Sequence, residues 1–318
     1  MKMRGYLTFM TLVFIFFQTL VYAGFAVYYG DVSPSNVNEL SKFNLLILSP
    51  LVEENYIKEL KDKNVTVVGY LSLATIGGWE PWAEEVPDSI IIGHWETWNE
   101  KEVDFSSPQW RGIVLNKAIP YILSKGFDGV FLDNLDYVDK YPEKREAMVK
   151  LIKAIREKYP DIVIVANRGF SITKEIAPYV DYILFEDFIT YYDFNDKEYK
   201  IYQDTDLQWV LAQAEMLKKL KVKVLALSYA DLGNEKQVKE FSKLVCKYAD
   251  EYGFEVYMAD ITLQKIGFNS CGNTKSTIST QTVLNEAKIG EENKNICGLG
   301  VILLLILLPR SLRELILR

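Results

Sequence analysis

Eight short apolar runs constrain the fold of this chain more than any other feature. They cover residues 24–30, 43–50, 65–73, 127–134, 162–169, 182–187, 224–230 and 255–261. The runs are continuous rather than alternating, which is typical of strands covered on both faces of a parallel sheet. Helical periodicity fills residues 146–159, 207–220 and 236–252 between them. Eight strands with crossover helices predict a closed (β/α)8 barrel, an α/β fold, in a single domain of residues 24–270.

Two connections of this predicted barrel differ from the rest. Residues 30–42 leave room for only a short helix. Residues 74–107, here called the excursion, form a long irregular segment after the third strand, and such segments in compact domains are usually functional. The excursion and the residues just after it hold a cluster of tryptophans, namely Trp79, Trp82, Trp95, Trp98 and Trp110. We expect the excursion to fold over the C-terminal face of the barrel, with these rings either stacking on sugars or packing as a lid.

The first 23 residues have the three-part pattern of a secretory signal. A basic start is followed by an apolar run from Tyr6 to Leu20 and by a small residue, Ala23, which predicts cleavage after Ala23. An uncleaved anchor is the alternative, because the apolar stretch is nearly long enough to span a bilayer. Either outcome predicts an extracellular protein.

The other end of the chain predicts attachment to the membrane or cell envelope. Residues 271–296 are rich in Thr, Ser, Asn and charge and predict a flexible linker. Residues 297–318 contain a short apolar run and then a basic tail, which resembles the C-terminal sorting signals of archaeal surface proteins. In those signals a Cys-Gly-Pro motif precedes the run; Cys297 and Gly298 match it, and Leu299 stands where Pro is expected. An amphipathic terminal helix packed on the domain is the alternative.

Three cysteines in an exported chain leave one thiol without a partner. Cys246 and Cys271 could form a disulfide that closes a modest loop, or both could be free buried thiols. Cys297 would then be the odd one and part of the sorting motif.

Composition excludes several classes of function. The net charge is −7 and no basic block lies in the middle of the chain, which argues against a nucleic-acid partner. The single histidine, His94, excludes a His-rich metal site and leaves little for a Ser-His-Asp or Cys-His arrangement. No phosphate loop, dinucleotide-binding glycine pattern or CxxC motif is present, so we expect neither a metal nor another cofactor. An enzyme of this composition must use carboxylates.

Polar residues gather where the apolar runs end, which in a (β/α)8 barrel is where active sites lie. Asp133 and Glu186 are the candidate catalytic residues. The candidate substrate-binding residues are Tyr29, Asp31, Tyr70, Ser72, Asn134, Asp136, Asn167, Arg168, Asp187, Tyr229 and Asp231.

The fourth run carries several acids, and their positions separate their roles. Alternation along the strand places Phe131 and Asp133 on the interior face, with Asp133 at the rim. Asp128 lies at the opposite end of the strand, where a structural role is expected. Asp136 follows in the loop and can reach the substrate, whereas Asp139 is expected to be solvated.

Two carboxylates from nearby strand ends are what glycoside hydrolysis requires. We expect Asp133 to act as nucleophile or transition-state stabiliser and Glu186 as general acid/base, although the reverse order is open. Asn167, on the strand between them, would hold a carboxylate or a sugar substituent by hydrogen bonds.

Five segments, "GYLSL", "VDFSSPQWR", "GFDGVFLDNLD", "ANRGF" and "LFEDF", resemble in this order the barrel of glycoside hydrolase family 114, the endo-α-1,4-polygalactosaminidases and related predicted extracellular polysaccharide hydrolases. The resemblance covers residues 25–268. It implies a hydrolase of amino-sugar polysaccharides with Asp133 and Glu186 as catalytic carboxylates and Asn167 as the Asn that ends the fifth strand. The family often continues its third-strand motif with Gly-Glu, whereas this chain reads "YLSLATIGGWEPW", so Glu80 is displaced and the exact sugar is left open.

Two functions of different classes follow. The first is a secreted or surface-anchored glycosidase, expected to be a monomer, with a polysaccharide as its substrate. The second is a barrel of the cell envelope that binds carbohydrate without cleaving it. The two facing carboxylates favour the glycosidase, because binding alone does not need them.

Overall fold

The computed structural model describes residues 24–271. The predicted signal segment (1–23), nearly all of the linker (271–296) and the C-terminal segment (297–318) lie outside these residues. No helix within residues 24–271 is both long and apolar enough to cross a membrane.

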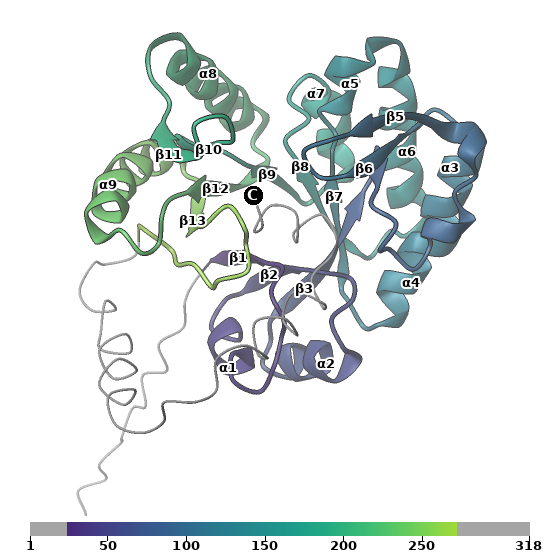
Figure 1. Ribbon diagram of the computed structural model, residues 1–318, viewed down its shortest axis with the longest axis horizontal. Helices are drawn as coiled ribbons and strands as arrows, with labels where there is room; N and C mark the ends of the chain where they lie inside the picture. The colour runs from purple at the N-terminus through teal and green to yellow at the C-terminus, as the bar shows by residue number, and fades with distance from the viewer. Residues whose placement is uncertain (1–23, 272–318) are drawn as a thin grey trace, which may run out of the picture.

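Eight parallel strands form a nearly closed barrel, as the apolar runs predicted. They follow the order β1-β2-β3-β7-β8-β9-β12-β13, and β13 returns beside β1 (Figure 1). Their bounds are β1 Phe25–Tyr28, β2 Leu45–Leu48, β3 Thr66–Ser72, β7 Gly129–Asp133, β8 Val163–Asn167, β9 Tyr182–Phe185, β12 Lys223–Tyr229 and β13 Glu255–Ala259. Each predicted run overlaps one of these strands, and only β12 begins before its run, by one residue at Lys223. The (β/α)8 prediction is therefore confirmed for this part of the chain.

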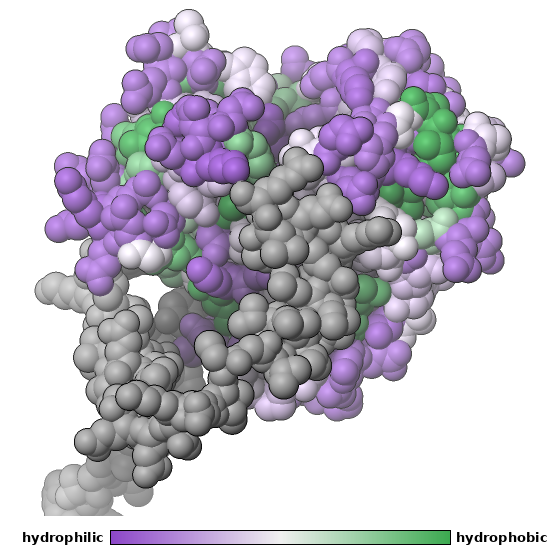
Figure 2. Space-filling view, viewed as in Figure 1, coloured by the Kyte–Doolittle hydropathy of each residue, from purple (hydrophilic) through white to green (hydrophobic). Residues whose placement is uncertain are grey.

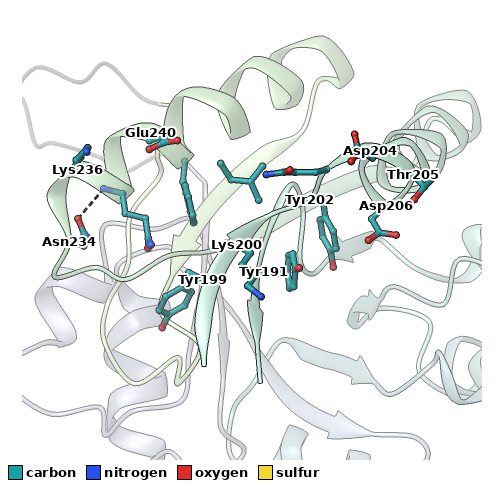
Figure 3. A pocket seen from close by; sticks show the side chains of 14 residues that line it. Tyr191, Tyr199, Lys200, Tyr202, Asp204, Thr205, Asp206, Asn234, Lys236 and Glu240 are labelled. Atoms are coloured by element: carbon teal, nitrogen blue, oxygen red, sulfur yellow. Dashed lines mark hydrogen bonds between the residues drawn. The ribbon is translucent and has the colours of Figure 1, made fainter. Parts of the chain in front are cut away.

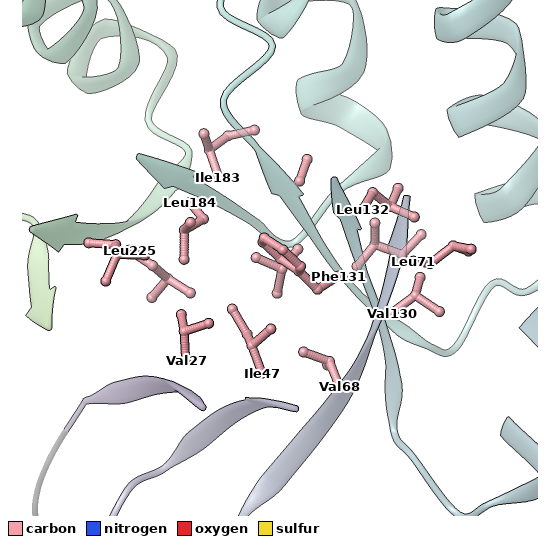
Figure 4. Close-up of a cluster of buried hydrophobic side chains, with 14 of the residues drawn as sticks. Val27, Ile47, Val68, Leu71, Val130, Phe131, Leu132, Ile183, Leu184 and Leu225 are labelled. Atoms are coloured by element: carbon pink, nitrogen blue, oxygen red, sulfur yellow. The ribbon is translucent and has the colours of Figure 1, made fainter. Parts of the chain in front are cut away.

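The register of the ladders fixes which side chains fill the barrel. Phe131 of β7 pairs with Tyr70 of β3 on one side and Val165 of β8 on the other, and alternate residues of each strand therefore point inward together. Figure 4 shows apolar side chains from around the ring converging in the centre, among them Val27, Ile47, Val68, Phe131, Leu184 and Leu225. Because apolar residues fill the interior, only the last inward position of each strand is left for polar chemistry.

Helices cover the outside of the ring (Figure 1). They are α1 Val37–Leu40, α2 Glu54–Asp62, α3 Pro108–Ile113, α4 Ile119–Ser124, α5 Tyr137–Lys140, α6 Arg145–Lys158, α7 Thr173–Ile176, α8 Asp204–Leu220 and α9 Glu235–Tyr252. A π-helical turn, Val114–Ala118, joins α3 to α4. The three predicted periodic segments coincide with α6, α8 and α9, and the first connection holds only the four-residue α1, as expected.

The excursion contains a small antiparallel sheet rather than irregular chain alone. Its strands are β4 Thr75–Ile76, β5 Ile91–Trp95 and β6 Glu100–Val103, in the order β4-β6-β5. A second insertion, which was not predicted from the sequence, is the hairpin of β10 Thr190–Asp193 and β11 Glu198–Ile201. The two insertions meet through the rings of Trp98 and Phe194, whose centroids lie 5.8 Å apart.

The tryptophans divide between the two roles that the sequence left open. Trp110 is fully buried and donates a hydrogen bond from Nε1 to the carbonyl of Leu73 at 2.8 Å, and Trp82 is buried against Tyr121. These two pack the excursion onto the barrel. Trp79, Trp95 and Trp98 are half-buried and leave ring surface accessible.

A disulfide joins Cys246 of α9 to Cys271, with the two Cα atoms 5.2 Å apart. Of the two alternatives open from the sequence, the structure therefore shows the bonded one. The bond ties the end of the described chain to the outer helix layer.

Candidate active site

Inward-pointing polar side chains occupy the last position of five consecutive barrel strands. The ladder between β3 and β7 pairs Ser72 with Asp133, and the ladder between β8 and β9 pairs Asn167 with Leu184. Glu186 follows Leu184 by two residues and therefore shares its face. Tyr229 ends β12 and is buried. Parallel pairing thus brings these groups to one rim, at the C-terminal ends of the strands.

Asn167 bridges the two candidate catalytic carboxylates. Its side-chain nitrogen donates to Asp133 Oδ1 at 2.8 Å and to Glu186 Oε2 at 2.7 Å. These two carboxylate oxygens therefore cannot be further apart than the sum of the two distances, 5.5 Å. The Asn167 oxygen is buried and has no hydrogen-bond partner within residues 24–271. The amide must keep this orientation, because the reverse one would set its oxygen against both carboxylates.

Each carboxylate has further donors of its own. The hydroxyl of Tyr229 donates to Glu186 Oε1 at 2.6 Å, so both oxygens of Glu186 accept a hydrogen bond. The backbone N–H of Asn134 donates to Asp133 Oδ1 at 2.8 Å, and the Tyr70 hydroxyl also bonds to this carboxylate. Both side chains are thus fixed in orientation while remaining partly exposed to the rim.

Burial and the repulsion between neighbouring charges control the protonation of Asp133 and of the tyrosines around the carboxylate pair. Burial, and after it the nearby charge of Glu186, raises the pKa of Asp133 to about 6, although hydrogen bonds from Asn167, the Asn134 backbone and Tyr70 oppose the rise. Burial raises the pKa of Tyr29, Tyr70 and Tyr229 well above the usual value, and the neighbouring carboxylates raise it further. The tyrosines are therefore neutral hydrogen-bond donors at physiological pH.

The residue after each central polar position has a left-handed backbone. Asn134, Arg168 and Asp187 have φ values of 62°, 52° and 59°, and they directly follow Asp133, Asn167 and Glu186. Such conformations cost about 1–3 kcal/mol each for residues other than glycine and gather at functional sites. The strain turns the chain sharply at the rim, so that consecutive residues point to different parts of the site.

Arg168 and two acids form a charged cluster beside Glu186. Arg168 Nε lies 2.9 Å from Asp136 Oδ2 as an ion pair without the alignment of a hydrogen bond, and its Nη1 lies 3.4 Å from Asp187 Oδ2. Burial and the charge of Glu186 raise the pKa of Asp187 to about 7, while Arg168 lowers it. Asp136 also accepts a hydrogen bond from the Gly169 backbone at 2.9 Å. The single guanidinium is therefore matched by two carboxylates.

On the other side of Asp133, the excursion adds residues that sequence reasoning missed. Asn134 donates from its side chain to Ser72 Oγ at 2.9 Å and to Thr75 Oγ1 at 3.0 Å, and Thr75 donates to Glu100 Oε2 at 2.6 Å. Glu80 is buried and accepts two contacts from the Gly77 backbone N–H. No pattern in the sequence distinguishes Glu100 from the other glutamates of the excursion, because its position depends on the pairing of β4 with β6.

Four other acids lie outside the hydrogen-bond network of the carboxylate pair. Asp31 and Asp231 are both exposed, and Asp231 accepts a hydrogen bond from the backbone N–H of Gly233 in its own loop. Asp128 accepts a hydrogen bond from the Val67 backbone and pairs with Lys61, a structural role as the sequence predicted. Asp139 is exposed to solvent.

His94 lies on β5 and is partly exposed, with its Nε2 3.7 Å from Glu96 Oε2. Within the described chain, no group of three or more His, Cys, Asp or Glu residues is arranged to hold a metal ion.

A wide open groove of about 720 Å³ lies outside the carboxylate layer, between the β10–β11 hairpin and the first turns of α8 and α9 (Figure 3). Tyrosines and acids line it, including Tyr191, Tyr202, Asp204, Asp206 and Glu240. Tyr202 stacks on Tyr191 with ring centroids 4.3 Å apart. Neither Asp133 nor Glu186 lines this groove. The face of the molecule around it is mainly hydrophilic (Figure 2).

A barrel of eight parallel strands, with two carboxylates facing each other across the C-terminal rim, has the architecture of the (β/α)8 glycoside hydrolases. The sequence defines the family within this class. Residues 28–276 match the pattern of glycoside-hydrolase family GH114, and the chain belongs to this family.

Solved structures share the fold at low sequence identity. The glycoside hydrolase domain of PelA from Pseudomonas aeruginosa superposes with a TM-score of 0.66 and 19% identity, covering 77% of this chain and 98% of that one. Aspergillus fumigatus Ega3, solved in complex with galactosamine, gives a TM-score of 0.61 and 16% identity, covering 79% and 95%. A comparison with curated protein sequences found no match.

Proposed function

We propose that this protein is a secreted or surface-anchored hydrolase that cleaves an amino-sugar polysaccharide, with Asp133 as nucleophile and Glu186 as general acid/base. The observation that carries the proposal is the Asn167 amide, which donates to both carboxylates and holds their nearest oxygens within 5.5 Å, the sum of the two hydrogen-bond distances. Family membership supports the reaction class. The galactosamine bound to Ega3 supports an amino sugar.

The separation of the carboxylates favours retention of configuration. Retaining glycosidases have carboxyl groups about 5–5.5 Å apart, whereas inverting ones need about 6.5–9.5 Å to admit a water between them. In the first step Asp133 attacks the anomeric carbon while Glu186 gives its proton to the leaving oxygen. In the second step Glu186 takes a proton from water, and the resulting hydroxide displaces Asp133.

Hydrogen bonds favour the ionised form that Asp133 needs as a nucleophile. Burial and the charge of Glu186 raise the pKa of Asp133 to about 6, and the hydrogen bonds from Asn167, the Asn134 backbone and Tyr70 oppose this rise. Asn167 and the Asn134 backbone then stabilise the charge on Asp133 Oδ1.

The charge of the rim fits a cationic polymer. Carboxylates surround the pair, and in the described cluster only Arg168 opposes them, itself neutralised by Asp136 and Asp187. An ammonium group of an amino sugar would find acids within reach from several strands. Neutral tyrosines and the half-buried rings of Trp79 and Trp98 add surfaces for the apolar faces of sugar rings.

Secretion and surface attachment rest on the sequence of the two ends. The signal pattern of residues 1–23 and the Cys297-Gly298 motif with its apolar run support export and anchoring. A non-catalytic binding barrel is the alternative, and the shared amide argues against it because binding does not require two carboxylates held this close.

Hydrolysis of defined polymers tests the proposal. Purified protein should release reducing ends from a galactosamine polymer, and the assay should include glucosamine and uronate polymers. Asp133→Asn and Glu186→Gln should abolish release while retaining polymer binding, because they remove transition-state roles. Asp62→Asn is the control and should remain active, because Asp62 is an exposed acid on the outer helix α2 that pairs with Lys58. Full activity in either variant of the pair would refute the assignment, and binding without hydrolysis of every polymer would favour the alternative.

A further inference from the structure

We propose that Glu100, on strand β6 of the excursion, is a positioning residue that orients the Asp133 carboxylate through Thr75 and Asn134. The inference rests on the proposed role of Asp133 as nucleophile. It gives the excursion a role in positioning a reacting group.

A continuous chain of hydrogen bonds connects the carboxylate of Glu100 to that of Asp133. Thr75 donates to Glu100 Oε2 at 2.6 Å, the Asn134 side chain donates to Thr75 Oγ1 at 3.0 Å, and the Asn134 backbone N–H donates to Asp133 Oδ1 at 2.8 Å. Ser72 Oγ closes a branch, 2.7 Å from Thr75 Oγ1 and 2.9 Å from the Asn134 side-chain nitrogen. Both amide hydrogens of Asn134 are thereby used.

This anchoring matters because of the backbone of Asn134. Its φ is 62°, a conformation that side chains other than Asn, Asp and Gly rarely adopt. The backbone N–H of this residue donates to Asp133 Oδ1, and the two hydroxyl acceptors hold the side chain of the same residue. Losing one acceptor would let the turn relax and the Asp133 carboxylate rotate.

The charge of Glu100 determines the direction of every proton in the chain. An ionised Glu100 only accepts, so Thr75 must donate to it, and Ser72 must then donate to Thr75. Both hydroxyl oxygens are thus left as acceptors for Asn134. A neutral Glu100 can instead donate its proton to Thr75. The Thr75 hydroxyl is then no longer required to donate to Glu100, and the hydrogen-bond directions along the chain are no longer fixed.

Glu100 lies in a setting where both protonation states are accessible. Burial raises its pKa to about 7, the hydrogen bond from Thr75 lowers it, and the charges of Glu80 and Asp133 raise it. The other titratable groups that face it are the neutral hydroxyls of Tyr70 and Tyr137.

No lysine or arginine among residues 24–271 forms an ion pair with Glu100. Lys101, its neighbour on β6, reaches Asp88 instead, with Nζ and Oδ1 3.8 Å apart. Within the described residues, no ion pair therefore neutralises the charge of Glu100.

The test uses isosteric changes along the chain and the pH profile of kcat/KM on the hydrolysed polymer. Glu100→Gln removes the charge, Thr75→Val removes the hydroxyl, and Thr75→Ser restores it. Glu96→Gln is the matched control, because Glu96 is a largely exposed glutamate of the same excursion with only a distant contact to His94.

We expect Glu100→Gln and Thr75→Val to lower kcat by between about 10-fold and 100-fold with KM little changed, since a misplaced reacting group costs rate rather than ground-state binding. Thr75→Ser should recover most of the rate. Because the pKa of Glu100 is about 7, its ionisation should add an inflection near pH 7 to the wild-type profile, and this inflection should be absent from the Glu100→Gln profile.

The outcomes separate this inference from the proposed function. Loss of activity in Asp133→Asn together with wild-type kcat and a retained inflection near pH 7 in Glu100→Gln would overturn the inference and leave the function intact. A lower kcat in Glu100→Gln with the inflection retained would make Glu100 only a structural residue and would overturn the inference as well. Activity in Asp133→Asn would instead refute the function.

Discussion

Replacement of Asn167 by alanine tests how the two carboxylates of the site are held together. The change removes one nitrogen that donates to Asp133 Oδ1 at 2.8 Å and to Glu186 Oε2 at 2.7 Å. Hydrogen bonds to charged groups contribute about 1.5–3 kcal/mol each, so the ionised form of Asp133 should lose stabilisation of that order.

The sign and size of the effect on activity follow directly. Asn167 lowers the pKa of Asp133, which is about 6 in the intact site. Without the amide the pKa rises, by about one unit for each 1.4 kcal/mol lost. The acid limb of kcat/KM should therefore move up by about one unit, and kcat should fall by about 100-fold because the nucleophile is no longer oriented.

The assay is the pH profile of kcat/KM for polymer hydrolysis, with thermal unfolding of each variant measured alongside. Asn234→Ala is the control: Asn234 caps α9 by accepting from the Gln237 backbone at 3.1 Å. It should lose about 1 kcal/mol of stability with its acid limb unmoved. An acid limb in Asn167→Ala that coincides with that of wild type would refute the reasoning.

Three further predictions concern stability and location. The pKa values of Asp187 and Glu100 are raised to about 7 in the folded state, so these groups favour folding below their unfolded pKa of about 4 and lose that contribution as pH rises through about 7. Glu100→Gln should therefore gain a few degrees in thermal midpoint relative to wild type at pH 8 and not at pH 4, and an equal difference at both would contradict this. Reduction of the Cys246–Cys271 disulfide, which spans 25 residues, should lower the free energy of unfolding by about 3 kcal/mol in denaturant titrations, whereas Cys297→Ser should leave it unchanged. Deletion of residues 297–318 should release the protein from cells into the medium, and equal retention of the truncated and full chains on fractionation would contradict anchoring.

The barrel was predictable because its strands carry a signal that a sequence displays directly. Burial on both faces demands continuous apolar runs, and each of the eight runs overlaps one strand. The β10–β11 hairpin was missed because its strands, Thr190–Asp193 and Glu198–Ile201, are short and half-exposed and mix charged with aromatic residues.

The same distinction applies to the site. Alternation along the strands was enough to place Asp133, Asn167 and Glu186 on one rim, because their positions follow from the strands themselves. The approach of Glu100 and Thr75 to Asn134 was not predictable, since it depends on how the excursion folds back. The cluster around Arg168 was not predictable either. It depends on the left-handed backbone of Arg168 and Asp187, and the residue types at these positions do not indicate such a conformation.

Trapping the covalent intermediate tests the central claim most directly. Glu186→Gln should react with an amino-sugar substrate that has a good leaving group, because departure then needs no acid, and it should stall before hydrolysis because no base activates water. Intact-protein and peptide mass spectrometry should find one glycosyl unit attached to the peptide that contains Asp133. Attachment to another peptide, or prompt turnover of the activated substrate without an adduct, would contradict Asp133 as the nucleophile.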